Sequence, residues 1–337
     1  MTNHGQVVKL KPENIYPRGI FEKRFVELNG KKIGMILKGK DLRNPILLMM
    51  SGGPALPEYL LEYFYPSQLD QDYTLCYYSY YGTGLSYQPG IRKKDLTSSA
   101  YLEDALAVTK YLRETFESER LFLLGHSFGS YLALMLASDY PENYVGYIAM
   151  SQVTDQLKSE EIAFSWMRDQ YQEMGKQAIV KKFDSYLNET GSMDIDRYLV
   201  SSLRDKAMHQ LGVGTTRKMQ SVINDIFLAS FSLRDFTWRE RLNIWRGKLD
   251  YRSSPVIATS FNFSAFKTVQ TLEIPICFLV GRYDLTCNAS LQEAYYEFLQ
   301  AKNKKIYLFD ESAHSPIFEE QTKAIEIMAT IKKEWQN

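Results

Sequence analysis

The chain has 337 residues, 45% of them hydrophobic, and its 40 basic and 40 acidic residues leave a formal net charge of zero. Such a chain can bury one large core together with a subsidiary domain. The balanced charge excludes the basic footprint of a protein that binds nucleic acid, and it gives an anionic membrane surface little to attract. With three cysteines and four histidines, we expect neither a disulfide framework nor a structural metal site.

The apolar segments exclude two further classes of protein. Residues 1–20 contain no apolar stretch of the kind that a secretory signal needs. The longest apolar runs, such as residues 45–50 and 274–280, have the length of a strand and not of a membrane-spanning helix. We therefore expect a cytoplasmic protein without a membrane span.

The first part of the chain carries strand patterns. Apolar and polar residues alternate in two short runs, residues 21–28 and 32–38. Asn29-Gly30 joins them and favours the type I′ turn of an antiparallel hairpin. The uniformly apolar residues 45–50 predict a central strand covered on both faces. A helix over residues 57–65 and a strand over residues 73–79 are expected next.

Helices and strands alternate in the rest of the chain except in one long segment. Before that segment we predict, in chain order, a helix over residues 99–116, a strand over 121–124, a helix over 128–138 and a strand over 144–150. After the segment the pattern resumes with a strand, a helix, a strand and a terminal helix: residues 274–280, 289–299, 305–309 and from 316 onward. This alternation predicts an α/β protein with a doubly wound, mostly parallel sheet.

The long segment between these two parts shows helical patterns throughout, as in residues 160–172, 175–187 and 237–250. A helical insertion between two strands of a sheet is typical of a lid that controls access to a site. We therefore predict a core formed by residues 1–150 and 256–337, and a helical cap formed by residues 151–255.

A serine lies at the tip of the turn between the strand at 121–124 and the helix that follows it. The motif is Gly125-His126-Ser127-Phe128-Gly129, the Gly-x-Ser-x-Gly nucleophile elbow of α/β-hydrolases. Gly125 and Gly129 are expected where neighbouring backbone approaches closely. Ser127 is therefore the candidate nucleophile.

A serine nucleophile needs a base, and the base needs a group that orients it. Asp284 follows the strand at 274–280 and His314 follows the strand at 305–309, in the chain order that α/β-hydrolases use. Taken singly, Asp284 could cap the helix that begins near Asn288, and His314 could be a surface histidine. The other histidines fit the role of base poorly: His126 adjoins the serine, His4 is in the N-terminal tail and His209 is in the predicted cap.

The tetrahedral intermediate of acyl transfer also needs donors for its oxyanion. One is expected to be the backbone N–H of Phe128, the residue after the nucleophile. The second is expected from the loop after the strand at 45–50, and we predict the N–H of Gly53.

Five short motifs together resemble the proline iminopeptidase branch of the α/β-hydrolases, peptidase family S33. They are residues 51–54, 82–86, 125–130, 281–284 and 313–315. The family carries His-Gly-Gly-Pro-Gly and Asp-Gln-Arg-Gly-x-Gly-x-Ser, whereas this chain has Ser51 and Ala55 at the ends of the first motif and Ser79-Tyr80-Tyr81 at the start of the second. The resemblance implies the fold, the triad and hydrolysis, but it does not imply the substrate.

The same resemblance implies that acidic residues on the cap would recognise a free N-terminal amine. The cap contains Glu160, Glu161, Glu173 and Glu240. Because glutamate is usually exposed, we expect each of them to be a solvated charge on a helix face.

The sequence thus predicts a serine hydrolase that acts by acyl transfer without a metal or an organic cofactor. Its partner is expected to be a small molecule or a short peptide, with an aminopeptidase of the proline iminopeptidase type as the first hypothesis. A carboxylesterase for small apolar esters is the alternative. A binding protein without turnover, built on a hydrolase scaffold, is a third hypothesis.

Overall fold

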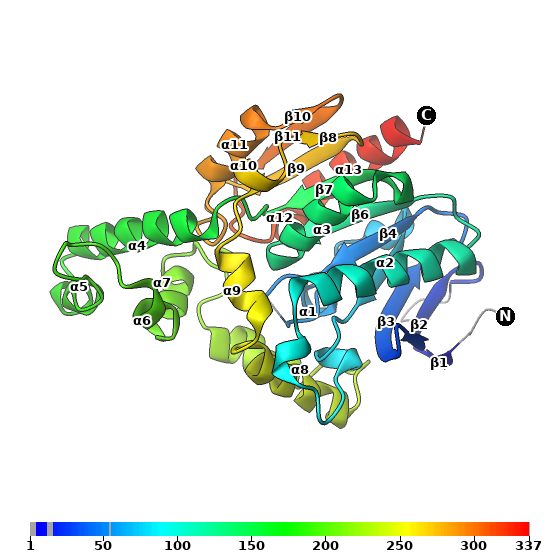
Figure 1. The fold of residues 1–337 in the computed structure, drawn as a ribbon, viewed down its shortest axis with the longest axis horizontal. Helices are drawn as coiled ribbons and strands as arrows, with labels where there is room; N and C mark the ends of the chain where they lie inside the picture. Colours follow the sequence, from blue (N-terminus) through cyan, green and yellow to red (C-terminus); the bar gives the residue numbers. More distant parts are fainter. Residues whose placement is uncertain (1–4, 12–15, 54, 337) are drawn as a thin grey trace.

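The computed structural model describes residues 5–11, 16–53 and 55–336. Within these residues, nine strands form one sheet in the order β1-β2-β3-β5-β4-β6-β7-β9-β11 (Figure 1). They are β1 (Gln6–Lys9), β2 (Ile20–Leu28), β3 (Lys31–Gly39), β4 (Ile46–Met50), β5 (Thr74–Tyr78), β6 (Leu121–His126), β7 (Tyr144–Met150), β9 (Ile276–Gly281) and β11 (Lys304–Phe309). The six strands from β5 to β11 in this order are parallel, and β1, β2 and β3 pair antiparallel. The prediction of a mostly parallel sheet is confirmed.

The predicted hairpin is formed by β2 and β3. Leu28 faces Lys31 across the turn, and the two turn residues Asn29 and Gly30 have φ angles of 51° and 70°. Positive φ at both positions is the signature of a type I′ turn. The strand β1, which no pattern predicted, extends the sheet beyond β2.

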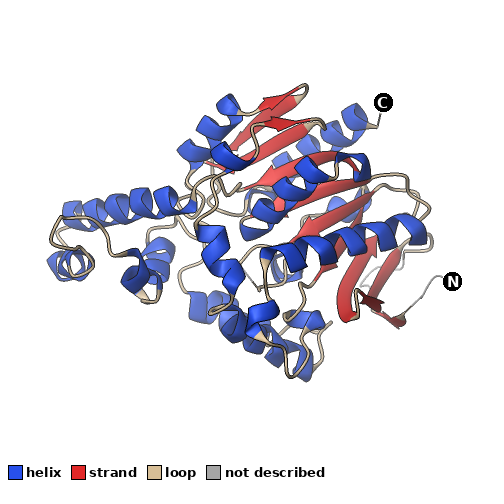
Figure 2. Cartoon of the chain, viewed as in Figure 1, coloured by secondary structure: helices blue, strands red, loops and turns tan. Residues whose placement is uncertain are grey.

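Helices cover both faces of the sheet (Figures 1 and 2). Alternate residues of β4 point to opposite sides, so that Leu48 and Met50 pack with helices α2 (Ser98–Thr115), α3 (Phe128–Asp139) and α11 (Ala289–Phe298). Leu47 and Met49 pack with α1 (Tyr59–Phe64) and α13 (Gln321–Trp335) on the other side. Burying such side chains contributes about 1.5–3 kcal/mol each, and covering on both faces explains why this strand is apolar at every position.

Helices make up most of the segment between β7 and β9, both in the predicted stretch 151–255 and beyond it as far as Thr268, and they pack in two different ways. The helices α4 (Gln156–Glu173), α5 (Gln177–Asp184), α6 (Ile195–Leu199) and α7 (Leu203–Gln210) enclose a cluster of their own around Phe164, Phe183 and Tyr198. They project from the sheet at the left of Figure 1. The π-helix η5 (Val222–Leu228), α8 (Trp238–Tyr251), α9 (Pro255–Phe261) and α10 (Ala265–Thr268) pack instead on the clusters that flank the sheet.

Short elements complete the chain: the 3-10 turns η1 (Leu69–Gln71), η2 (Gly84–Ser86), η3 (Lys93–Asp95) and η4 (Pro141–Asn143), the helix α12 (Pro316–Glu319), and a two-stranded parallel sheet of β8 (Thr271–Leu272) and β10 (Gln300–Ala301). Of the helices described here, none is long and apolar enough to cross a membrane.

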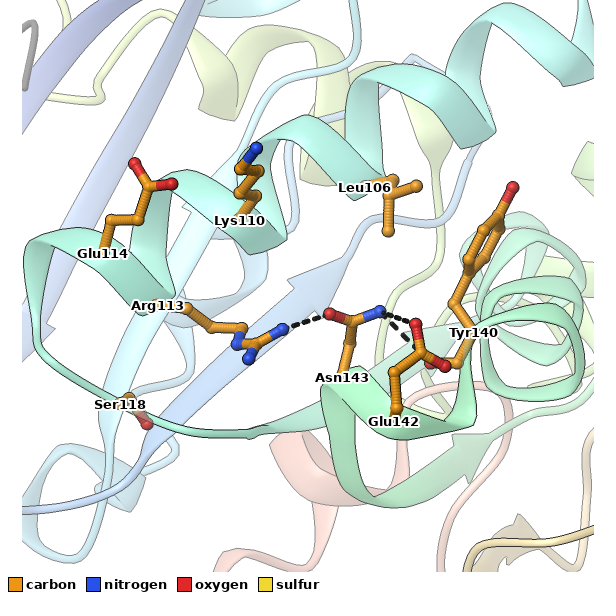
Figure 3. Close-up of a pocket in the computed structure, with 8 residues that line it drawn as sticks. All are labelled: Leu106, Lys110, Arg113, Glu114, Ser118, Tyr140, Glu142 and Asn143. Carbon is orange, nitrogen blue, oxygen red and sulfur yellow. Dashed lines mark hydrogen bonds between the residues drawn. The ribbon is translucent and has the colours of Figure 1, made fainter.

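A surface pocket of about 460 Å³ lies between α2 and η4 (Figure 3). Its lining includes Arg113, whose guanidinium contacts the Asn143 side chain. Ser118 lies three residues before β6, and Asn143 directly precedes β7. The pocket therefore opens at the amino ends of these strands, opposite the edge at which β6 leads into Ser127.

Candidate active site

Ser127 occupies a strained turn between β6 and α3. Its backbone angles are φ 53° and ψ −126°, a region that a residue with a side chain enters only when the surrounding structure holds it there. The flanking glycines are required by space: a Cβ on Gly129 would lie 2.0 Å from the Met50 carbonyl oxygen, and one on Gly125 would lie 2.6 Å from Ser130 Cα. The serine side chain, partly exposed, is thus held at the carboxyl edge of the sheet by the geometry expected of a nucleophile elbow.

Asp284 and His314 meet at the same edge. The Nδ1 atom of His314 lies 3.0 Å from both carboxylate oxygens of Asp284, and both side chains are buried. Asp284 comes directly after β9 and His314 from the loop after β11. The two strands are parallel neighbours, and for this reason residues 30 positions apart in the chain come into contact.

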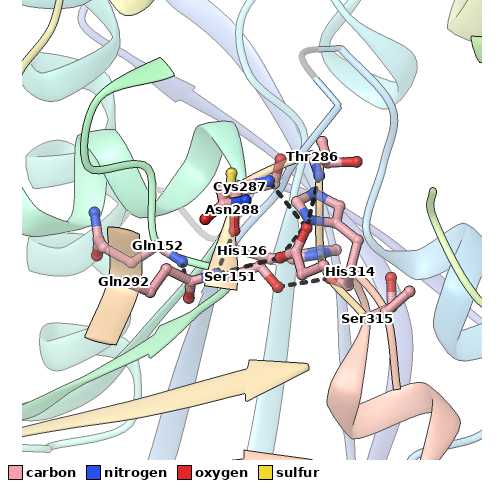
Figure 4. Close-up of polar contacts among 12 residues, drawn as sticks. His126, Ser151, Gln152, Thr286, Cys287, Asn288, Gln292, His314 and Ser315 are labelled. Carbon is pink, nitrogen blue, oxygen red and sulfur yellow. Dashed lines mark hydrogen bonds and ion pairs between the residues drawn. The ribbon is translucent and has the colours of Figure 1, made fainter. Parts of the chain in front are cut away.

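The remaining contacts of Asp284 fix its orientation, and three of the partners, Thr286, Cys287 and Gln292, are labelled in Figure 4. Its Oδ1 atom accepts hydrogen bonds from the backbone N–H groups of Thr286 and Cys287, both at 2.9 Å. Its Oδ2 atom accepts a bond from the Gln292 side chain at 3.3 Å. The alternative that Asp284 caps α11 is wrong, because the side chain of Asn288 accepts the N–H groups at the start of that helix.

No hydrogen bond joins the Ser127 side chain to Asp284 or His314 in the described residues, and its contacts lie with neighbouring loops. A Cβ on Gly52 would lie 3.0 Å from Ser127 Cβ, so the serine packs against the loop that holds Gly53. Burial raises the pKa of the Cys287 thiol, and Ser127 contacts that thiol. Hydrogen bonds between a nucleophile and its base often tighten only when substrate binds.

The loop after β4, from which the first oxyanion donor is expected, contains two residues with positive φ angles. Gly53 has a φ of 100° and Ala55 a φ of 70°. The family motif has glycine at the position of Ala55, and the alanine keeps the left-handed conformation that glycine adopts freely. Phe128, whose N–H is the second expected donor, is the first residue of α3, where backbone N–H groups have no partner within the helix.

A lysine from the inserted helices contacts this loop. The Nζ atom of Lys248 on α8 donates to the Gly53 carbonyl oxygen at 2.5 Å. Burial lowers the pKa of this ammonium group to about 8. The inserted helices and the expected oxyanion loop are thereby joined.

The expectation for Glu160 is wrong. Its side chain is completely buried on α4, where the guanidinium of Arg204 binds both carboxylate oxygens. A buried carboxylate needs such a partner because desolvation disfavours its charge. Glu161 and Glu173 are exposed as predicted, and Glu240 forms an ion pair with Lys23 at 2.7 Å.

Sequence reasoning missed one pair of side chains at this edge. The His126 ring lies between the Glu58 carboxylate, 2.7 Å from Nδ1, and the His314 carbonyl oxygen, 2.8 Å from Nε2 (Figure 4 shows the two histidines). The signal available in the sequence was the histidine inside the elbow itself. Glu58, which belongs to no motif, gave none.

His209, the remaining histidine that the structure describes, forms no hydrogen bond with Ser127, Asp284 or His314. His209 on α7 contacts the Asp205 carbonyl oxygen and the Thr215 hydroxyl, and His4 is outside the described residues. In the part of the chain that the structure describes, no group of three or more His, Cys, Asp or Glu side chains is arranged to hold a metal ion.

Several known proteins are similar to this chain in sequence or in fold. Residues 65–191 match the family described as serine aminopeptidase, S33. The probable aminopeptidase YbaC of Bacillus subtilis is 28% identical over 300 residues, which cover 88% of this chain and 91% of that protein. The proline iminopeptidase of Saccharolobus solfataricus is 23% identical over 291 residues, covering 85% of this chain and 84% of that protein. Among solved structures, the proline iminopeptidase of Mycobacterium smegmatis aligns with a TM-score of 0.67 and 14% identity, covering 93% of this chain and 98% of that one.

Proposed function

From the premise that this chain is a serine hydrolase of the α/β-hydrolase fold, resembling the proline iminopeptidase branch of family S33, we propose that it hydrolyses small peptides by acyl transfer to Ser127. The sequence predicted both the α/β-hydrolase fold and the resemblance to family S33, and both predictions are confirmed. The observation that carries the proposal is the Asp284–His314 contact at the strand edge where the strained Ser127 turn lies.

In the proposed mechanism, Ser127 Oγ attacks the substrate carbonyl carbon and His314 Nε2 takes the serine proton. Asp284 accepts a hydrogen bond from His314 Nδ1, which leaves Nε2 as the basic nitrogen and stabilises the imidazolium that forms. The backbone N–H groups of Gly53 and Phe128 stabilise the oxyanion. His314 then protonates the leaving amine, and water releases the acid from the acyl-enzyme in a second passage through the same steps. The mechanism uses no metal and no organic cofactor.

The preferred substrates are proposed to be short peptides with an apolar N-terminal residue. This choice is supported by the relatives, which are named aminopeptidase or proline iminopeptidase. We also propose that residues 151–255 act as a cap above Ser127. The contact of Lys248 with the Gly53 carbonyl supports a cap that touches the catalytic centre.

A carboxylesterase is the second candidate, and one observation favours it. The buried carboxylate of Glu160 is already neutralised by Arg204, so it offers no free negative charge to a substrate ammonium group. An ester has no such group and needs no carboxylate. The two candidates therefore differ in whether a free amine on the substrate increases kcat/KM.

Two measurements test these proposals. A fluorophosphonate probe is expected to label the wild-type protein and to leave Ser127→Ala unlabelled; equal labelling of both would refute the assignment, and an unlabelled wild type would favour a binding protein without turnover. Turnover of proline and alanine anilides is then compared with turnover of short acyl nitrophenyl esters. Hydrolysis of the esters with no hydrolysis of either anilide would refute the aminopeptidase.

A further inference from the structure

We propose that Glu58 and His126 are positioning residues that hold three parts of the catalytic centre in place: the loop of the oxyanion donors, the nucleophile turn and the loop of His314. The inference rests on the proposed function, because it concerns the same centre. Neither side chain is expected to touch the substrate or the reacting atoms.

The position of His126 makes it a bridge. It is the last residue of β6 and directly precedes Ser127. Its Nε2 atom lies 2.8 Å from the backbone oxygen of His314, and the two imidazole rings are 5.0 Å apart between centroids. The Ser151 hydroxyl donates to the same His314 oxygen at 2.8 Å. The backbone of the proposed base is thus tied to the ends of β6 and β7 by two side chains.

Glu58 extends this connection to the oxyanion loop. One carboxylate oxygen, Oε1, lies 2.7 Å from His126 Nδ1, and the other, Oε2, accepts the Gly52 N–H at 3.1 Å. The backbone N–H of Glu58 donates to the Ser51 hydroxyl at 3.2 Å. Gly52 immediately precedes Gly53, so the carboxylate fixes the peptide next to the expected donor.

The hydrogen-bond partners determine where the protons of this pair lie. A backbone carbonyl only accepts, so His126 Nε2 carries a proton toward His314. Burial alone lowers the pKa of the His126 imidazole, but the facing Glu58 carboxylate outweighs it and raises that pKa. Because both side chains are buried, the hydrogen bond between them is shielded from water and is stronger than a contact at the surface.

We expect the contacts of Glu58 and His126 to support catalysis in addition to stabilising the fold. Displacement of a catalytic group by about 1 Å costs about 100-fold in rate. Without the pair, the Gly52 peptide and the His314 backbone lose their common partner, and the distance between oxyanion donor and base is no longer set. Substrate binding on the cap side is not affected by this change, so we expect kcat to fall while KM stays the same.

The test compares variants that keep or break the bridge. His126→Asn can reach Glu58 or the His314 carbonyl but not both, because an asparagine side chain is shorter than an imidazole ring. Glu58→Ala removes the carboxylate. Glu58→Gln keeps the shape, accepts the Gly52 N–H and donates to His126 Nδ1, so it is expected to retain the bridge. Asp104→Asn is the matched control: Asp104 is a buried carboxylate paired with Lys31 at 2.8 Å, on α2.

The readouts are kcat and KM on the substrate that the wild-type protein turns over best, per active site counted with the fluorophosphonate, together with Tm. We expect kcat to fall about 10- to 100-fold in His126→Asn and in Glu58→Ala, with KM within about twofold. Glu58→Gln is expected to stay near wild type, and the double variant Glu58→Ala/His126→Asn to be no slower than its slower parent. Asp104→Asn is expected to lower Tm without lowering kcat.

Wild-type kcat in His126→Asn, whatever its Tm, would overturn the inference and leave the proposed function intact. An unlabelled and inactive wild type would overturn both. Glu58→Ala removes the whole carboxylate and can fail to fold. In that case His126→Asn, which keeps one of the two hydrogen bonds, and Glu58→Gln decide the test.

Discussion

Asp284→Asn tests the proposed base most directly, because the contacts of this side chain determine how an amide would sit. The Oδ1 atom accepts two backbone N–H groups, from Thr286 and Cys287, so the asparagine oxygen has to occupy this position. The amide nitrogen then takes the place of Oδ2 and faces His314 Nδ1. An N–H donor there requires an unprotonated Nδ1, which moves the imidazole proton to Nε2.

A histidine with its proton on Nε2 has no lone pair for the proton of Ser127. The equivalent substitution in a Ser-His-Asp protease leaves the geometry intact and lowers kcat about 10⁴-fold. This factor corresponds to about 5.4 kcal/mol in the activation barrier. The Gln292 side-chain nitrogen donates both to Oδ2 and to the Cys287 carbonyl oxygen, so it loses one of its two acceptors, and we expect a loss of stability of about 1–3 kcal/mol from the buried N–H that is left without a partner.

The assay is kcat on the substrate that the wild-type protein turns over best, with the concentration of folded protein measured by circular dichroism. The rate of fluorophosphonate labelling is expected to fall with kcat. Asp104→Asn serves again as the control for removal of a buried charge. If Asp284→Asn retained activity within about tenfold of wild type while folded, His314 would not depend on Asp284 and the proposed mechanism would be refuted.

Three other predictions concern a close backbone contact, a buried ion pair and a buried lysine. Gly129→Ala places a Cβ 2.0 Å from the Met50 carbonyl oxygen, so we expect a loss of about 3 kcal/mol or more in urea unfolding; an unchanged midpoint would contradict this. Arg204→Met leaves the Glu160 carboxylate buried and unpaired, at a cost of about 3–5 kcal/mol, and Arg204→Met/Glu160→Met is expected to recover most of it. Between pH 8 and 10.5, the unfolded chain binds more protons at Lys248 than the folded chain, because burial lowers the pKa of this group from 10.5 to about 8. Its contribution to stability therefore rises with pH in that window, by at most about 1.4 kcal/mol per unit, and Lys248→Met is expected to lose this part of the rise.

Local patterns were sufficient to predict the strands of the large sheet that the structure describes, except β1, and the helices that cover it. The hairpin at Asn29-Gly30 depends on two residues with positive φ, and the elbow depends on glycines within two residues of Ser127. The hairpin turn and the elbow each depend on residues that are close together in the chain, so both can be predicted from a short sequence motif. The strand β1 escaped prediction because its four residues are all exposed and show no alternation; it is a strand because β2 offers it an edge to pair with.

Prediction failed where distant charges met. Glu160 was expected in solvent, because an isolated glutamate is costly to bury. Arg204, 44 residues further along the chain, removes that cost. No periodicity connects these two positions, since a pair across two helices depends on how the helices pack.

Long-range contacts also explain why the sequence predicted the candidate triad but not the pair formed by Glu58 and His126. The order of Ser127, Asp284 and His314 was predictable from sequence, because parallel strands carry their following loops to one edge of a sheet and each residue follows a strand. The contact of Glu58 with His126 spans 68 residues, and that of His126 with the His314 backbone spans 188. These contacts depend on which side of its strand the histidine faces and on a carboxylate from a loop without a motif. Only the packed tertiary structure decides this, because no local pattern connects residues that lie 68 and 188 positions apart in the chain.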